Sequence, residues 1–148
     1  MKFPVQTPVA PSLPKLSVFQ PGDEEESVER TEIQGQSVGS REEARVATAL
    51  DKLGHRYFYQ FRILDMKGVR GAYIIDFLVL STVPLSTPVE VYGAYWHRGQ
   101  LGSEDQFRLA QIEDHFRGEA NDVVIIWGNE VQTQDDANAV VQRKIGPA

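Results

Sequence analysis

The segment at residues 72–80 constrains the fold more than any other part of the chain. It reads AYIIDFLVL, so it is apolar at almost every position and carries one acid, Asp76, in its middle. An apolar run of this length between turn-forming segments at 67–71 and 83–88 is typical of a β-strand that is buried on both faces. Such strands lie inside sheets covered by helices, so the sequence predicts an α/β domain with a carboxylate in its interior.

Hydrophobic periodicity and capping residues place the other elements around this strand. We expect helices and strands in the order α-β-β-β-α-β-α, over residues 40–53, 56–63, 72–80, 89–95, 103–116, 123–127 and 135–145. The three early strands can form an antiparallel meander. The strand–helix–strand unit from 89 to 127 needs a crossover, which favours a parallel pair. The expected architecture is a mixed sheet flanked by helices.

The first 39 residues differ from the rest in composition. Five prolines within residues 1–21 favour extended conformations, an acidic run follows at 23–26, and Gly35 to Ser40 is predicted to be a flexible joint. We therefore divide the chain into an extended N-terminal arm, 1–39, and one folded domain, 40–148. Composition leaves two alternatives for the arm, disorder or binding to a protein partner or neighbouring subunit.

Composition also limits the chemistry. The chain has no cysteine, which excludes disulfides, thiol nucleophiles and cysteine-ligated zinc. The net charge of −6 is divided equally between arm and domain, so neither has the positive field of a non-specific nucleic-acid binder. We recognise no signal peptide and no membrane span, and expect no membrane partner. The expected location is the cytoplasm of a bacterial host cell, or a virion.

Asp76 and Glu90 are the strongest candidates for chemistry, because each interrupts an apolar strand. A buried ionised carboxylate is costly unless a cation or hydrogen-bond donors compensate it. If the two strands are neighbours, both carboxylates and the carbonyl of Val91 form a hard oxygen site suited to Mg²⁺. The alternative for Asp76 is capping by backbone amides. Glu43 could contribute through a water, and its alternative role is a capping box with Ser40.

Several segments carry a family likeness when they are taken together. They are YQFRI at 59–63, YIIDF at 73–77, VEVYGAYWH at 89–97, Asp105 with Arg108, and VVIIWGNEV at 123–131. In this order they resemble the PD-(D/E)xK nuclease superfamily, and within it the very-short-patch-repair (Vsr-like) endonucleases. The resemblance covers most of residues 40–145. It implies a restriction-endonuclease-like fold and Mg²⁺- or Mn²⁺-dependent cleavage or nicking of DNA.

The resemblance also implies roles for the acids and for one histidine. Asp76 would be the principal metal ligand, Glu90 the acid of the second motif and Glu43 the helical acid. Residues 93–97 are similar to the Gly-x-Phe-Trp-His stretch of Vsr-like enzymes, which implies that His97 is a general acid or base.

Further residues are expected around this centre. Asp105 and Arg108 lie one helical turn apart, and would orient the histidine and contact phosphate, or form an ordinary ion pair. Gln60 matches a recurrent glutamine of the related domains and is expected to line the site. The remaining candidates are expected to contact DNA, and they are Tyr95, Trp96 and Arg98. The two aromatic side chains would stack on bases, or instead pack beneath a helix.

The chain departs from the family pattern at two points. Tyr92 replaces the lysine of the (D/E)xK motif, and a neutral phenol cannot supply the charge of lysine. The second histidine and the cysteines that follow the Trp-His pair in Vsr-like enzymes are absent, so no structural zinc is expected. Three functions remain open: a metal-dependent DNA endonuclease, an inactive nuclease-fold scaffold that binds partners through its arm in a phage particle or DNA-processing complex, and a nucleic-acid-binding module without cleavage.

Overall fold

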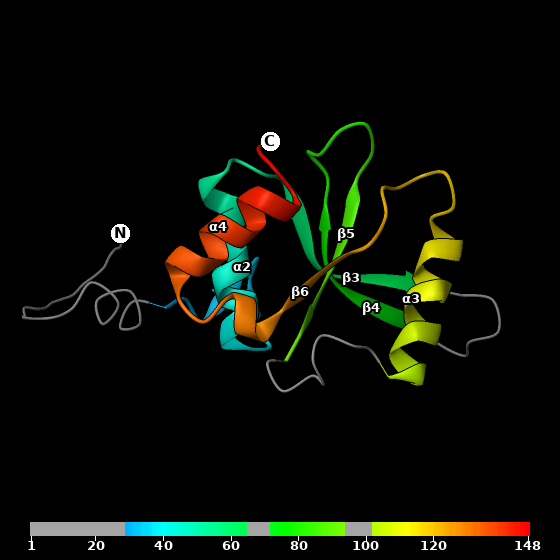
Figure 1. Ribbon diagram of the computed structural model, residues 1–148, viewed down its shortest axis with the longest axis horizontal. Helices are drawn as coiled ribbons and strands as arrows, with labels where there is room; N and C mark the ends of the chain where they lie inside the picture. Colours follow the sequence, from blue (N-terminus) through cyan, green and yellow to red (C-terminus); the bar gives the residue numbers. More distant parts are fainter. Residues whose placement is uncertain (1–28, 65–71, 94–101) are drawn as a thin grey trace, which may run out of the picture.

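The computed structural model describes residues 29–64, 72–93 and 102–148 (Figure 1). The predictions for His97, Tyr95, Trp96 and Arg98, and those for residues 1–28, lie outside the described residues. The main elements are α2 (Arg41–Lys52), β3 (Tyr57–Leu64), β4 (Ala72–Val79), β5 (Thr87–Tyr92), α3 (Ser103–His115), β6 (Val124–Trp127), the 3-10 helix η2 (Gly128–Glu130) and α4 (Gln134–Lys144). The order of the α-helices and of strands β3 to β6 is the expected one, and the structure adds η2 and a short hairpin before α2.

The main sheet has four strands in the order β3-β4-β5-β6. β3 pairs with β4, and β4 with β5, in antiparallel fashion. β5 and β6, which α3 connects along the chain, pair in parallel. The antiparallel meander and the parallel pair are thereby confirmed. The described residues form a mixed α/β fold with a four-stranded mixed sheet and three α-helices.

The sheet contributes to two separate hydrophobic cores. α2 and α4 lie at one end of the sheet in Figure 1 and pack on one half of each long strand, including Tyr59 of β3 and Phe77 of β4. α3 lies at the other end and packs on the other half, including Ile63 and Ile75. The change from one core to the other falls between these pairs, at the level of Asp76.

A short hairpin precedes α2. It consists of β1 (Glu32–Ile33) and β2 (Gln36–Ser37), joined by two residues with positive φ, Gln34 and Gly35. Positive φ at both positions is the geometry of a tight two-residue hairpin turn. Ile33 is fully buried in the core beside α2 and α4. Residues 29–39, which the sequence analysis assigned to the arm and to a flexible joint, are therefore packed against the domain, because Ile33 supplies an apolar side chain to its core.

Side chains cover both edges of the main sheet. The Gln34 amide donates to the carbonyl of Tyr57 at 2.6 Å and accepts from the N–H of Tyr59 at 2.9 Å, so it occupies the free edge of β3. On the opposite edge, the ammonium of Lys144 donates to the carbonyl of Ile125 in β6 at 2.8 Å. Exposed strand edges promote aggregation, and side chains that bond to them block further strand addition at these positions.

Candidate functional site

Asp76 and Glu90 lie together where β4 and β5 part. The backbone pairing of these strands runs from Val79 to Phe77 on β4 and stops there. One residue further, the N–H of Asp76 donates to Oε2 of Glu90 at 3.0 Å, and the N–H of Val91 donates to Oδ2 of Asp76 at 2.8 Å. Each carboxylate thus replaces a missing strand-to-strand bond, and backbone capping of Asp76 coexists with its proximity to Glu90.

The pairing on the other side of Asp76 is interrupted as well. Gln60 would face Asp76 across the β3–β4 ladder, but the ladder omits this pair and resumes on both sides of it. Gln60 has φ of 55°, the left-handed region, which costs a residue other than glycine about 1 kcal/mol or more. Backbone strain of this kind concentrates at functional sites. The expectation that Gln60 lines the site agrees with its place opposite Asp76.

The pKa of Asp76 is raised from 3.8 to about 8, mainly by burial and then by the negative charges of Glu90 and Glu43. The N–H of Val91 and the charge of Arg108 act in the opposite direction. Burial also raises the pKa of Glu90, which Arg108 partly offsets. Carboxylates held this close in a poorly hydrated place repel one another, and a proton or a cation relieves the repulsion.

Arg108 supplies the positive charge at this centre. It extends from α3, and its Nε and Nη2 lie 3.1 Å and 3.0 Å from Oε1 of Glu90. The guanidinium also donates to the carbonyl of Ile74 and lies over the ring of Tyr73, 5.2 Å from its centre. The partner of Arg108 within the described part of the chain is thus Glu90, and the ordinary ion pair with Asp105 is not formed. Asp105 and Arg108 instead line a groove beside Tyr73.

Glu43 approaches the same centre from α2. Its backbone N–H donates to Oγ of Ser40 at 3.1 Å, so the capping interaction uses the backbone of Glu43 and leaves its side chain available. The carboxylate accepts a bond of 2.5 Å from the phenol of Tyr59. Burial raises the pKa of Glu43, and its charge acts on both Asp76 and Glu90. Capping and proximity to the other acids therefore occur together, and Tyr59 is a site residue that the sequence analysis missed.

On β5, Tyr92 and Val91 stand beside the two acids. The Tyr92 ring packs on Trp127 with 5.7 Å between ring centres, and burial raises the pKa of its phenol, which keeps it neutral at ordinary pH. It cannot provide the charge that lysine would. The N–H of Val91 donates to Asp76, and a role for the Val91 carbonyl as a metal ligand stays a prediction.

The donor atoms suit a divalent cation in kind. They are carboxylate oxygens, the ligands that Mg²⁺ and Mn²⁺ prefer. Oδ1 of Asp76 has no hydrogen-bond partner among residues 29–64, 72–93 and 102–148, whereas both oxygens of Glu90 accept bonds, from Arg108 and from the Asp76 N–H. Within these same ranges no three Asp, Glu, His or Cys side chains are grouped closely enough to hold a metal ion. The centre thus consists of two adjoining carboxylates, with Glu43 as a nearby third.

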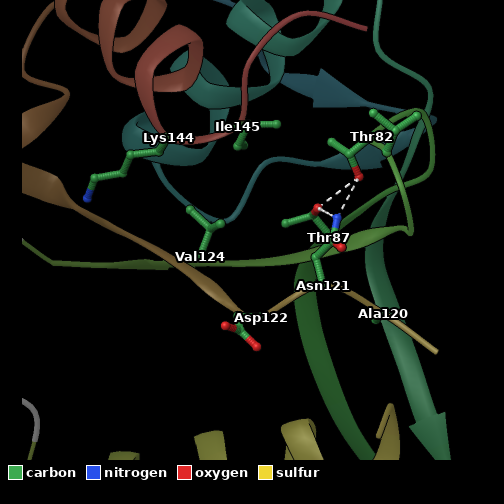
Figure 2. A pocket seen from close by; sticks show the side chains of 9 residues that line it. Thr82, Thr87, Ala120, Asn121, Asp122, Val124, Lys144 and Ile145 are labelled. Atoms are coloured by element: carbon green, nitrogen blue, oxygen red, sulfur yellow. Dashed lines mark hydrogen bonds between the residues drawn. The ribbon is translucent and has the colours of Figure 1, made fainter. Parts of the chain in front are cut away.

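A groove of about 520 Å³ lies elsewhere on the domain (Figure 2). The amide of Asn121 donates to the hydroxyl of Thr87 at 3.0 Å, and Thr82 and Thr87 bond to each other at 2.8 Å. These bonds tie the loop after β4 to the loop after α3. Lys144 also lines the groove, but its ammonium is engaged by Glu130. We regard the groove as a structural joint, since these polar groups already have partners within the protein.

The fold and the two carboxylates define a mixed α/β protein with a buried acidic centre at the point where two strands separate. Comparison of the chain with protein-family models, curated proteins and solved structures finds no match. None of the helices in the described ranges has the length and apolar character needed to cross a bilayer.

Proposed function

We propose that the protein is a Mg²⁺- or Mn²⁺-dependent DNA endonuclease of the PD-(D/E)xK type, resembling the Vsr-like enzymes, which hydrolyses or nicks a phosphodiester at the Asp76–Glu90 centre. One observation carries the proposal: the buried carboxylate of Glu90 and the half-buried carboxylate of Asp76 adjoin where β4 and β5 part, and the pKa values of both are raised. Such perturbed pairs are typical of sites built for a cation or a proton. A bound divalent ion would polarise a phosphodiester oxygen and lower the pKa of a water nucleophile.

The residues of the chain have distinct roles in this proposal. Asp76 and Glu90 hold the cation, and the Val91 amide fixes the orientation of the Asp76 carboxylate. Arg108 orients Glu90 and provides the positive charge that Tyr92 cannot. Glu43 adds a third carboxylate through a water.

The resemblance supplies the other roles. His97 would act as general acid or base, and the DNA-contacting residues would be Tyr95, Trp96 and Arg98. DNA is the proposed partner, and the proposed location is the bacterial cytoplasm or a virion.

Plasmid nicking over a titration of Mn²⁺ or Mg²⁺ tests the proposal. We expect metal-dependent nicking by the wild-type protein and its loss in Asp76→Asn, which removes the charge while keeping the shape of the side chain. Asp122→Asn is the matched control, because Asp122 is exposed and lies outside the carboxylate centre. Equal nicking by Asp76→Asn and wild type would show that the activity does not come from this centre.

A second function is favoured by the engagement of Glu90. Both of its oxygens already accept hydrogen bonds, and the charge of Arg108 partly replaces that of a cation. This arrangement suits a nuclease fold that has become a scaffold. Such a scaffold would bind a protein partner or a neighbouring subunit through the N-terminal arm that precedes residue 29. No cleavage of duplex, single-stranded or mismatched DNA, together with no heat of Mn²⁺ binding in calorimetry, would support the scaffold over the enzyme.

A further inference from the structure

The phenol of Tyr59 is the centre of a small hydrogen-bond network beside the carboxylates. The side chain is almost fully buried, and its oxygen accepts from the N–H of Gly39 at 2.9 Å and from the amide of Gln60 at 3.3 Å. A phenol oxygen has one proton to donate and two lone pairs. Because the two N–H donors use the lone pairs, the proton is directed to Oε1 of Glu43, at 2.5 Å.

Gly39 closes the other side of the Glu43 carboxylate. A Cβ atom at Gly39 would lie 2.9 Å from Oε1 and 3.2 Å from Oε2 of Glu43, closer than such atoms normally approach. The backbone of Glu43 is held at the same time by the hydroxyl of Ser40. The carboxylate is therefore enclosed between Gly39 and Tyr59, although it stands at the beginning of a helix where an acidic side chain would ordinarily extend into water.

We infer that Tyr59 is a positioning residue, which holds the carboxylate of Glu43 next to the Asp76–Glu90 centre as the outer acid of a divalent-cation site. The inference rests on the proposed function and deepens it. Of the groups that hold the Glu43 carboxylate, the phenol makes the largest hydrogen-bond contribution to the pKa of this acid, ahead of Ser40 and Gly39. Without the phenol, the carboxylate is free to turn towards solvent, and its charge leaves the centre. Groups that orient acids around a metal typically change its affinity by 10–100-fold.

Calorimetric titration of Mn²⁺ into the metal-free, full-length protein tests this inference. We expect Tyr59→Phe to bind Mn²⁺ at least about tenfold more weakly than wild type. The control is Tyr57→Phe, which removes the same hydroxyl from the same strand, where it donates to Asp51 at 3.0 Å, away from the centre. Tyr57→Phe should bind within about twofold of wild type. Nicking by Tyr59→Phe should recover at saturating Mn²⁺, because the defect is in affinity.

A double variant separates positioning from a general structural effect. In a Glu43→Gln background, Tyr59→Phe should cause no further loss of Mn²⁺ affinity, because the acid that it positions is already gone. A further loss equal to that in the wild-type background would overturn the inference. The inference would also be overturned if Tyr59→Phe bound Mn²⁺ with the affinity of wild type while Asp76→Asn had lost binding. That result would leave the proposed function intact. Absence of Mn²⁺ binding by the wild-type protein would overturn both.

Gly39→Ala provides a second variant in case Tyr59→Phe does not fold. It keeps the phenol, and the backbone of Gly39 lies outside the positive-φ region that only glycine adopts readily. The added methyl displaces the flexible end of Glu43, so Mn²⁺ affinity should again fall by about tenfold. An unchanged affinity in a folded Gly39→Ala protein, checked by circular dichroism, would contradict the inference.

Discussion

At the scale of single residues, Asp76 is held in a place that opposes its own ionisation. It is largely buried beside two other carboxylates, and the Val91 N–H and Arg108 compensate its charge only in part. The folded protein therefore binds the proton of Asp76 more tightly than the unfolded chain does. The stability that this proton contributes is fully present below the unfolded pKa of 3.8, and it is lost as the pH rises towards the folded value of about 8.

Asp76→Asn should therefore stabilise the metal-free protein at alkaline pH. Asparagine can accept the Val91 N–H bond without a charge, so we expect a gain of ~2 kcal/mol or more at pH 8.5, which shrinks towards zero as the pH falls to 4. Urea unfolding in EDTA over this pH range measures it. A pH-independent difference between the two proteins would show that ionisation of Asp76 is not the cause.

At the scale of elements, β3 and α3 each carry one residue that adapts the element to the centre. In the middle of β3, opposite Asp76, the backbone of Gln60 has the positive φ of the left-handed region. α3 has only one fully buried side chain, Ile112, and its second anchor is the ion pair of Arg108 with the buried Glu90. The docking of α3 thus depends on the charge of the site that it covers.

Gln60→Gly should raise the stability of the protein by up to ~1 kcal/mol, because glycine adopts positive φ without strain. Arg62 is an exposed residue of the same strand and lies within the regular ladder. Arg62→Gly should lower the stability, because glycine at a regular strand position relieves no strain and costs conformational entropy. The opposite signs can be read from thermal unfolding. A loss of stability in both variants would mean that Gln60 is not strained.

Arg108→Met should destabilise the protein by ~2 kcal/mol, since it leaves the buried Glu90 without its ion-pair partner while part of the site remains open to solvent. The control is Arg117→Met on the chain just after α3, whose partner Asp114 is exposed, and little change is expected there. Adding Glu90→Gln to Arg108→Met should restore most of the loss in urea unfolding. Failure of that rescue would show that Arg108 acts through packing alone.

At the scale of the whole molecule, the described domain begins before its first helix. The hairpin of β1 and β2 buries Ile33 and covers the edge of β3. The residues before it are tied to α2 by ion pairs, with Glu29 2.6 Å from Arg45 and Arg30 2.7 Å from Asp51. The same segment ends at Gly39, next to the Glu43 carboxylate. Attachment of the hairpin and the geometry of the acidic centre are therefore linked.

Ile33→Ala should cost ~2–4 kcal/mol, the usual range for emptying a buried isoleucine site. Ile74→Ala is the matched control, because this isoleucine is 40% exposed and should cost clearly less. Both values come from urea unfolding of the full chain. Equal costs would indicate that the hairpin detaches readily and that the folded unit begins at α2.

The sequence by itself determined the order of the α-helices and of strands β3 to β6, and which two strands carry Asp76 and Glu90. Those features follow from local periodicity, capping residues and the cost of a charge in an apolar strand. Only the tertiary structure decided that Arg108 pairs with Glu90, that Tyr59 and Gly39 enclose Glu43, and that residues 29–39 belong to the packed domain. Apart from that of Gly39 with Glu43, these contacts join residues that are well separated in the chain. They depend on strand register and on the point where β4 and β5 separate, which no local pattern encodes.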